Sequence, residues 1–321
     1  MTTTVAIVIL NYRTPDLVVD CLMSLRDEAS DELKIKVYIG DADSKDGSVE
    51  KIQSFIEDQS LTWVTCYDIG KNGGFAFGNN EIVQKYVLDD PEIDYVHFLN
   101  PDTYIRPGAV RALVEHLKKS PTIGVAGSRL EDPDGSLRAY GFRFPAPWRE
   151  FFRGARLGIL DKLVPSAAVS IKPLTESREV DWVTGASFMM PRKVLDDVGL
   201  MDDNYFLYFE ETEWMSRIKA AGYSVWHVAD SHVVHLAGAS TGVRTGDKEI
   251  KRLSPIWLES RRRFMLTRYG RVGGAGATIL FLLGDIVYRV HRLLRGRRPE
   301  NPPHMWRDYV GHMFNRPQET P

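Results

Sequence analysis

Residues Val5–Leu10, VAIVIL, form a continuous apolar run that ends at Asn11-Tyr12-Arg13. Such a run is typical of a strand buried on both faces, as in a parallel sheet covered by helices. Pro15 and Asp16 then open a helical pattern that continues to about Arg26, because Pro is favoured in the first turn of a helix. This stretch therefore predicts an α/β fold.

The alternation of strand and helix continues along the chain. Further strands are expected at 35–39, 61–67, 95–99, 123–126, 180–183 and 225–228, and helices at 74–88, 107–118, 192–198 and 210–221. Strands separated by helices predict a mostly parallel sheet with right-handed crossovers. Residues 131–178 carry scattered Pro, Gly and Arg, and we expect them to be loops that pass over the sheet.

Length and composition are ordinary for a globular protein. The chain has 321 residues, 43% hydrophobic and 26% charged, which excludes wholesale disorder, collagen and a coiled coil. Cys21 and Cys66 are too few for a disulfide scaffold or a cysteine-rich zinc site, and they favour a reducing cytoplasm. No secretory signal is expected, since Val5–Leu10 is short and no basic residue precedes it.

Charge is distributed unevenly along the chain. Residues 261–298 hold ten arginines and one acidic residue, Asp285, a local charge of +9, so the rest carries −11 within a net charge of −2. Such a basic block favours an anionic lipid, a diphosphate or a nucleic acid. Uncharged stretches such as Val272–Gly284 are far shorter than the roughly 20 residues that span a bilayer. We therefore expect a soluble or peripheral protein.

Apolar residues in this basic block recur at helical spacing, with Asp285, Arg289 and Arg292 on the other side. The apolar positions are Ile279, Leu282, Leu283, Ile286, Val287, Val290, Leu293 and Leu294. Such a helix can lie in the interface of an anionic membrane, or it can pack onto the preceding domain or a second subunit. We expect a first domain over residues 1–250 and a helical, basic, amphipathic extension over 251–321.

Polar residues gather where the predicted strands end. The clusters are Asn11-Tyr12-Arg13, Asp41–Ser48, Lys71–Asn80 and Asn100-Pro101-Asp102. They should converge, because ligands of open α/β sheets bind at the carboxyl ends of the strands. A carboxylate such as Asp102 suits a hard divalent cation on a diphosphate, and glycines that enter a helix let backbone N–H groups approach a phosphate. Turn and capping chemistry explains each cluster taken alone equally well.

Two later clusters have residue types that carry chemistry. Aromatic residues between 205 and 209 lead into Glu210, Glu211 and Glu213, an arrangement that suits a general base beneath a sugar platform. Acidic residues at a helix start also match the helix dipole. His232 and His235 follow the last strand, and either can be a metal ligand or a structural residue.

Together and in this order, these segments resemble the inverting glycosyltransferases of family 2, which have the GT-A fold. The matching stretches are VAIVILNYR, DADSKDGS, NGGFAFGNN, FLNPDT, VDWVTGASFMM, FLYFEETEW and HLAGAS, within residues 4–240. The Asn-Pro-Asp-Thr and Asn-Gly-Gly-Phe-Ala forms are most similar to the rhamnosyltransferase branch, which uses dTDP-L-rhamnose and often acts on lipid-linked glycans. The resemblance implies a Rossmann-like, mostly parallel mixed sheet flanked by helices.

The resemblance also implies roles for individual residues. Glu211 stands at the position of the catalytic base with Glu210 as its rival, and Asp102 and His235 stand where the family holds Mg²⁺ or Mn²⁺. The residues implied to bind the nucleotide sugar are Asn11, Arg13, Asp41, Asn72, Gly73, Gly74, Asn79, Asn100 and Asp102. Those implied to border the acceptor are Trp182, Gly185, Glu213 and Trp214.

The chain departs from the family pattern at three positions. Ala42 replaces a frequent Asn, which weakens the expected contacts to the base of the nucleotide. Asn100 replaces the first Asp of the D-x-D motif and leaves one carboxylate for the metal. Glu211 replaces an Asp and is longer by one methylene, so Glu210 and Glu213 remain rivals for its role.

We therefore expect a metal-dependent inverting transferase. It would move a sugar, with L-rhamnose the first candidate, from a nucleotide diphosphate to a hydroxyl of a glycan or a polyprenyl-diphosphate-linked acceptor in cell-surface polysaccharide synthesis. The alternatives are a transferase of the same fold that uses a UDP-sugar, a sugar nucleotidyltransferase, a non-catalytic sugar-binding protein and a glycosidase. We expect a cytoplasmic location, extending to the inner face of the plasma membrane, and no nucleic-acid partner. A homodimer stays open.

Overall fold

The computed structural model describes residues 2–137, 141–236 and 250–314. Contacts divide the chain into two compact units. Unit 1 comprises residues 1–142, 171–206 and 210–245, and unit 2 comprises 143–170, 207–209 and 246–321, each within the described ranges. Unit 2 therefore differs from the predicted C-terminal extension, because it also includes residues 143–170. The last residues of the HLAGAS stretch, 237–240, lie outside the described residues.

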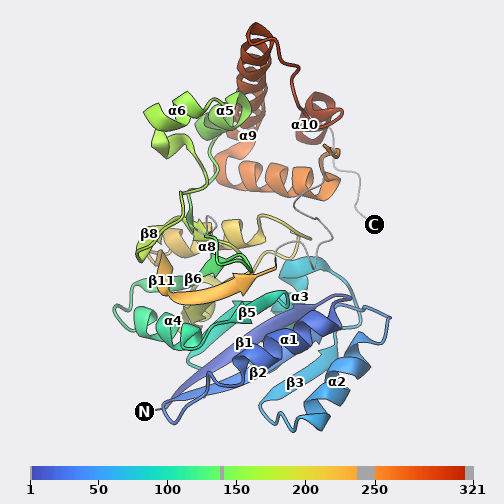
Figure 1. Ribbon diagram of the computed structural model, residues 1–321, viewed down its shortest axis with the longest axis vertical. Helices are drawn as coiled ribbons and strands as arrows, with labels where there is room; N and C mark the ends of the chain where they lie inside the picture. Colours follow the sequence, from blue (N-terminus) through green and yellow to red (C-terminus); the bar gives the residue numbers. More distant parts are fainter. Residues whose placement is uncertain (1, 138–140, 237–249, 315–321) are drawn as a thin grey trace. The chain divides into compact units, whose positions relative to one another are not determined.

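Unit 1 is built on a mixed sheet that has nine strands within the described residues, in the order β3-β2-β1-β4-β10-β6-β11-β5, with β8 paired to β11 (Figure 1). The strands are β1 (Thr3–Asn11), β2 (Leu33–Asp41), β3 (Val64–Asp68), β4 (Tyr95–Leu99), β5 (Thr103–Ile105), β6 (Ile123–Glu131), β8 (Arg178–Val180), β10 (Ser187–Pro191) and β11 (Ser224–His235). The strands β3, β2, β1 and β4 are parallel, as expected. The short strands β7 (Gly141–Phe142) and β9 (Trp182–Val183) pair separately.

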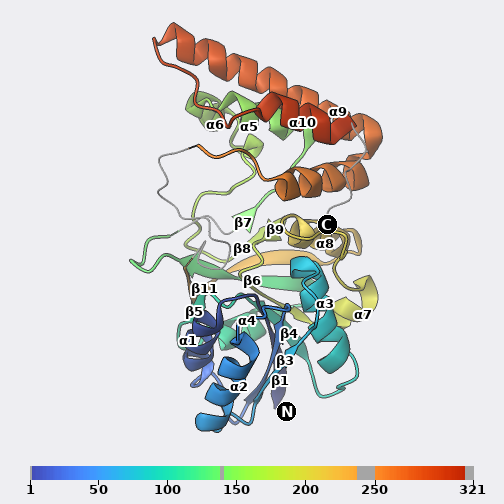
Figure 2. The same cartoon turned by 90° about the vertical axis from the view of Figure 1, so that its right-hand side faces the viewer.

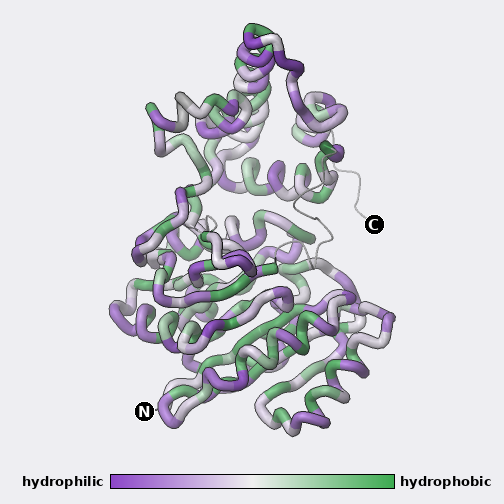
Figure 3. Tube along the Cα trace, viewed as in Figure 1, coloured by the Kyte–Doolittle hydropathy of each residue, from purple (hydrophilic) through white to green (hydrophobic). Residues whose placement is uncertain are grey.

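Helices cover both faces of this sheet. One hydrophobic cluster takes buried residues from α1 (Pro15–Leu25), α2 (Ser48–Asp58) and α4 (Ala109–Leu117). A second cluster on the other face takes them from α3 (Gly74–Tyr86), α7 (Arg192–Val198) and α8 (Glu210–Ala220) (Figure 2). The central strands are apolar along most of their length (Figure 3), which is the pattern of a doubly covered sheet. The predicted α/β fold class is confirmed.

The strands β5, β7 and β10 were absent from the sequence expectation, and β5 and β10 lie next to the candidate site. The strand β10 is antiparallel to β4 and β6, and β5 is antiparallel to the end of β11. Five- and three-residue strands carry too little periodicity to be recognised without their neighbours. They matter because β10 brings residues 185 and 186 to the end of β4.

Unit 2 is helical. Its elements are α5 (Pro147–Ala155), α6 (Gly158–Leu163), the 3-10 turn η1 (Pro165–Ala167), α9 (Pro255–Leu294) and α10 (Met305–Phe314). The expectation that residues 131–178 form loops is therefore wrong for α5 and α6, which are helices. Instead α5 packs on α9 through two glycines: a Cβ at Gly154 would lie 2.2 Å from the Phe281 carbonyl oxygen, and one at Gly284 would lie 2.1 Å from that of Phe151.

The long helix α9 bends at Gly270, whose φ of 68° is outside the helical region. The bend divides α9 into two limbs that run in different directions (Figure 1). Within the described residues, α9 is the one helix long and apolar enough to cross a membrane by length and composition, with a mean hydropathy of 1.4 over its best window. The sequence expectation considered only stretches without charge, whereas this helix also contains charged residues. One such helix is weak support for a membrane span.

Candidate active site

The predicted site residues gather at one edge of the sheet of unit 1. Asn11 and Asp41 are opposite each other at the ends of the parallel strands β1 and β2, and β4 runs parallel to β1. Because β10 is antiparallel, its first residue Ser187 pairs with Leu99 at the end of β4. The strand β11 is parallel to β6 and ends at His235. The convergence of these strand ends, expected from the sequence, is therefore present.

Asp41 is the organising residue of the loop after β2. It is 1% exposed, and its carboxylate accepts hydrogen bonds from the Asn11 amide at 2.6 Å and from the backbone N–H and hydroxyl of Ser44, both at 2.8 Å. The Asn11 amide oxygen in turn accepts the Thr14 backbone N–H at 3.2 Å. Asn11 and Asp41 therefore fix the conformation of this loop through hydrogen bonds. This is the turn chemistry that stood as the alternative to ligand binding for the strand-end clusters.

Three residues around this loop have left-handed backbone conformations. They are Arg13 (φ 58°), Asp43 (φ 54°) and Lys45 (φ 54°). This backbone conformation is unfavourable for residues with a Cβ, and it is concentrated at functional sites. The Arg13 backbone N–H donates to the Ser44 hydroxyl at 2.8 Å, and its Nε donates to the Ser44 carbonyl at 3.3 Å. Ser44 thus joins both loops, a role that the sequence analysis missed, although its place three residues after the strand-end Asp is a signal.

The glycine run 73–74 brings two loops into backbone contact. Gly74 has a φ of 90°, and a Cβ there would lie 2.0 Å from the Phe206 carbonyl oxygen. That carbonyl accepts the Phe75 backbone N–H at 2.8 Å, while the Asn72 side chain accepts the Gly74 N–H at 3.1 Å. Only glycine fits at position 74, and the run positions residue 206 at the first turn of α3.

Asn79 does not face the nucleotide edge as a free amide. It is 2% exposed, and its side-chain amide donates to the Phe75 carbonyl at 2.8 Å, one turn back in α3. A buried amide with an internal partner has a structural role, and the contact of Asn79 with the nucleotide sugar stays a prediction.

Asp102 and His235 lie side by side after β4 and at the end of β11. The distance from Asp102 Oδ1 to His235 Nε2 is 3.3 Å, and their side chains are 1% and 18% exposed. The Asp102 carbonyl accepts the Leu236 backbone N–H at 2.9 Å, which holds the two segments together. A carboxylate oxygen and an imidazole nitrogen are suitable donors for Mg²⁺ or Mn²⁺.

The two residues alone do not complete a cation site. No group of three or more His, Cys, Asp and Glu that could hold a metal occurs within residues 2–137, 141–236 and 250–314. The pair therefore fits a cation that takes its other ligands from a bound diphosphate and water, which is the usual arrangement for ions that act on phosphates.

Glu210 and Glu211 begin α8 and are the most perturbed acids of the site. Burial and the neighbouring Glu211 charge raise the pKa of Glu210 well above its usual range. Burial also raises the pKa of Glu211 to about 7, against an opposing effect of backbone N–H groups that include those of Thr212 and Gly185. Neither Glu210 Oε2 nor Glu211 Oε2 has a hydrogen-bond partner in the described part of the chain. Carboxylates held in this way are suited to proton transfer near neutral pH.

Residues 185 and 186 connect the cation pair to the carboxylate pair. The Ala186 carbonyl accepts the Asn100 backbone N–H at 2.9 Å, two residues before Asp102. Its neighbour Gly185 directs its backbone N–H toward Glu211, and the site edge thus continues from β4 to α8. A Cβ at Gly185 would lie 3.3 Å from the Phe75 ring, so a larger residue would crowd the junction.

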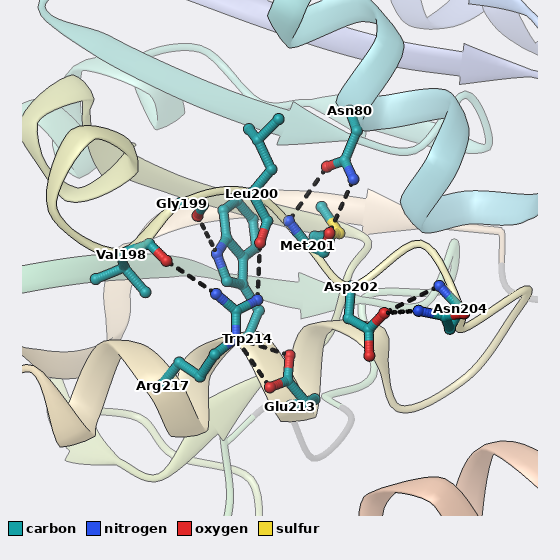
Figure 4. A network of polar contacts seen from close by, with 10 residues as sticks. All are labelled: Asn80, Val198, Gly199, Leu200, Met201, Asp202, Asn204, Glu213, Trp214 and Arg217. Atoms are coloured by element: carbon teal, nitrogen blue, oxygen red, sulfur yellow. Dashed lines mark hydrogen bonds and ion pairs between the residues drawn. The ribbon is translucent and has the colours of Figure 1, made fainter. Parts of the chain in front are cut away.

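Glu213 and Trp214 are buried, with their polar contacts inside unit 1 (Figure 4). Arg217 Nε donates to the Glu213 carboxylate at 2.8 Å, and its other nitrogens donate to the Val198 and Leu200 carbonyls. Trp214 is 1% exposed, and its indole N–H donates to the Gly199 carbonyl at 2.9 Å. We therefore correct the prediction that these two residues bind the acceptor: they anchor the segment before α8 to the core.

The other aromatic candidate for the acceptor side is half-buried. Trp182 stacks on Phe142 with ring centroids 4.3 Å apart, across the pair of strands β9 and β7. It lies three residues before Gly185 in the chain. Its role toward an acceptor stays a prediction.

Comparisons with known proteins agree with this geometry. A sequence profile described as glycosyl transferase family 2 matches residues 4–178. The chain is 27% identical over 222 residues to N-acetylglucosaminyl-diphospho-decaprenol L-rhamnosyltransferase of Mycobacterium tuberculosis (strain CDC 1551 / Oshkosh), covering 66% of this chain and 69% of that protein. It is 25% identical over 174 residues to the rhamnosyltransferase WbbL of Escherichia coli (strain K12), covering 53% and 64%.

Solved structures share the fold at low sequence identity. GalNAc-T7 with UDP, GalNAc and Mn²⁺ has a TM-score of 0.61 at 15% identity, covering 97% of this chain and 54% of that chain. The mannosyltransferase PcManGT from Pyrobaculum calidifontis, in complex with GDP-Man and Mn²⁺, has a TM-score of 0.53 at 12% identity, covering 98% and 85%. At these identities the likeness concerns the fold, and it confirms the expected GT-A architecture.

Proposed function

The chain belongs to glycosyl transferase family 2, and from this premise we propose that it transfers L-rhamnose from dTDP-L-rhamnose to a hydroxyl of a polyprenyl-diphosphate-linked glycan, in cell-surface polysaccharide synthesis. The observation that carries the proposal is the joint placement of the Asp102–His235 pair and the Glu210–Glu211 pair on one sheet edge, linked through residues 185 and 186. The similarity to two rhamnosyltransferases supports the choice of sugar.

Glu211 is the general base of the proposed reaction. Its carboxylate accepts the proton of the acceptor hydroxyl while that oxygen forms a bond to the anomeric carbon. The bond from this carbon to the diphosphate oxygen breaks on the opposite face, so that dTDP leaves and the configuration inverts. A pKa of about 7 leaves a substantial fraction of Glu211 ionised at neutral pH, and a matched base contributes about 10²–10⁴-fold to the rate.

Glu210 has a different role in this scheme. Burial and the Glu211 charge raise its pKa well above the usual range, which favours the protonated form of Glu210. A neutral neighbour does not repel the carboxylate that must accept the proton, because two adjacent buried carboxylates cannot both ionise easily. The two glutamates at the start of α8 would therefore carry one negative charge between them.

Asp102 and His235 are the residues that would hold a divalent cation. When bound, Mg²⁺ or Mn²⁺ would neutralise the charge that develops on the leaving diphosphate. The relatives of the same fold that contain Mn²⁺ support the use of a divalent ion. Asn100 orients this loop from its backbone, since its N–H and carbonyl bind Ala186 and Thr103, at 2.9 and 2.7 Å.

The alternative donor is a UDP-sugar, which a transferase of this fold would bind through the same edge. A thermal-shift panel separates the two, because at equal concentration the ligand that binds the folded chain more tightly stabilises it more. We expect dTDP-L-rhamnose with Mn²⁺ to raise the Tm more than UDP-glucose, UDP-GlcNAc or dTTP. A larger shift with dTTP and a sugar 1-phosphate would support a nucleotidyltransferase instead.

Product analysis tests the proposal directly. The chain is incubated with dTDP-L-rhamnose, a lipid-linked acceptor and Mn²⁺, and the lipid product is analysed by mass spectrometry for one added deoxyhexose. Release of free rhamnose without transfer would indicate a glycosidase, and donor binding without turnover would indicate a sugar-binding protein. A lipid-linked acceptor would place the enzyme at the inner face of the plasma membrane, the location that we propose; a homodimer remains an alternative arrangement.

A further inference from the structure

The second limb of α9, residues 271–294, buries its one acidic residue and leaves a long apolar face exposed. The side that packs against α5 and α10 contains Asp285, which is 0% exposed. Asp285 accepts hydrogen bonds from Arg289 at 2.6 Å and from the Trp306 indole at 2.7 Å, and Arg156 lies 3.6 Å away. The one acidic residue of this limb is thus paired inside unit 2.

The opposite side of the same limb is apolar and exposed. Its exposed side chains are Val272 (89%), Ile279 (52%), Leu283 (47%), Ile286 (43%), Val287 (37%), Val290 (50%), Leu293 (63%) and Leu294 (83%). Their spacing places them around one direction of the helix, about 180° from Phe281 and Asp285 at 100° per residue. They extend over about 33 Å at 1.5 Å per residue, whereas soluble proteins rarely expose contiguous apolar patches of this size.

Exposed arginines lie at both ends of this apolar face. Arg271 precedes it, and Arg295, Arg297 and Arg298 follow it. None of these four forms an ion pair with another described residue. Cations at the ends of an apolar stripe are the complement of a bilayer whose headgroups are anionic and whose acyl chains are apolar.

We propose that the face of α9 from Val272 to Leu294 docks into the headgroup and acyl boundary of an anionic bilayer, with the helix axis in the membrane plane. An in-plane orientation follows from the two sides of the helix, because the side with Asp285 is covered by protein and the other is bare. A spanning orientation would also take α5 and α10, which pack on α9, and their charged residues into the hydrocarbon, which is costly. The docking itself is argued without the proposed function. Only its biological role rests on that function: docking would bring the enzyme to a lipid-linked acceptor.

Sedimentation with preformed vesicles tests the docking, in the absence of sugar donor and acceptor. We expect the full chain to bind phosphatidylcholine vesicles that contain phosphatidylglycerol and to bind pure phosphatidylcholine weakly. The double variant Leu283→Glu/Ile286→Glu places two carboxylates on the apolar face and should weaken binding by more than about ten-fold. Met23→Glu is the matched control, since Met23 is 43% exposed on α1 of unit 1, and it should bind as the unmodified chain does.

A second variant tests the charge without altering the apolar face. Arg295→Ser/Arg297→Ser/Arg298→Ser removes three exposed cations and should lower partitioning onto anionic vesicles on the order of 100-fold, at about ten-fold or less per cation. These positions are exposed, so an unchanged Tm is expected and separates lost docking from lost folding.

Two outcomes would overturn the docking surface. One is equal vesicle binding by the unmodified chain and both variants. The other is a lipid-free dimer, seen by light scattering, that Leu283→Glu/Ile286→Glu converts to monomer, because a second copy would then cover this face. Donor binding measured by thermal shift on the same samples is an independent readout, so failure of membrane docking leaves the proposed transferase activity testable.

Discussion

Each unit contains a glutamate with a buried carboxylate oxygen, and the surroundings of the two carboxylates differ. Glu150 of α5 is 2% exposed and lies between Arg153 and Arg261, within 2.6 Å of the first. These arginines lower its pKa to about 2. Glu211 of α8 forms no ion pair with a residue in the described part of the chain, and burial raises its pKa to about 7. A buried carboxylate that is fully paired stabilises a fold, whereas one left without a cation stays available to exchange a proton.

The loss of Glu211 as a base should have the largest effect. We expect Glu211→Gln to reduce transfer by about 10²–10⁴-fold, while donor binding in a thermal-shift assay stays intact, because the amide keeps the shape but cannot accept the proton. Glu213→Gln is the control on the same helix: it should keep transfer within a few-fold and lower the Tm, since Glu213 binds Arg217. Near-normal turnover of Glu211→Gln would move the base to Glu210.

Removal of the paired carboxylate should affect stability instead. Glu150→Gln leaves Arg261, which is 3% exposed, without its counter-charge, and breaking a buried pair costs about 3–5 kcal/mol. Chemical denaturation followed by helix signal should therefore show earlier unfolding, which we assign to unit 2. Donor binding, which we assign to unit 1, should be unchanged at denaturant concentrations below that transition, and it serves as the internal control. A double variant, Glu150→Gln/Arg261→Met, should recover part of the loss.

The pH dependence of stability should have opposite signs at the two glutamates. Because the folded-state pKa of Glu211 lies above its ordinary value, folding becomes less favourable as pH rises from about 4.5 through 7. Glu211→Gln should thus be more stable than the unmodified chain at pH 8, by roughly 3 kcal/mol, and equal to it near pH 4. The contribution of Glu150 is present above about 4.5 and is lost as pH falls toward 2. Equal Tm differences at pH 4 and pH 8 would contradict this comparison.

The smallest of these effects is expected at the cation pair. Asp102→Asn should remove most of the extra stabilisation that Mn²⁺ gives to the chain with dTDP-L-rhamnose, a loss of about 10–100-fold in donor affinity. Stabilisation by the donor without metal should change little. His232→Ala is a matched control three residues from His235, because His232 binds Glu131 at 2.8 Å rather than Asp102. Identical metal dependence in Asp102→Asn would refute the assignment.

Local sequence patterns predicted much of the fold. The bounds of β4 and α7 coincide with those expected, and those of α1, α3 and α8 differ by a residue or two. These elements have strong periodicity or a clear first-turn signal such as Pro15. The strands β5 and β10 and the helices α5 and α6 were missed, because short elements take their structure from the neighbours against which they pack.

By itself, the sequence determined the α/β class, the order of the strand-end clusters and the candidate acids, since these depend on residues that are close along the chain. Only the tertiary structure decided which acids are paired. Asp41 accepts a hydrogen bond from Asn11, 30 residues away, and Glu150 pairs with Arg261, 111 residues away. Glu211 forms no ion pair with a residue in the described ranges. The tertiary structure also decided that α9 turns its charged side inward. The physical reason is that pairing and burial depend on groups distant in sequence, which no local pattern records.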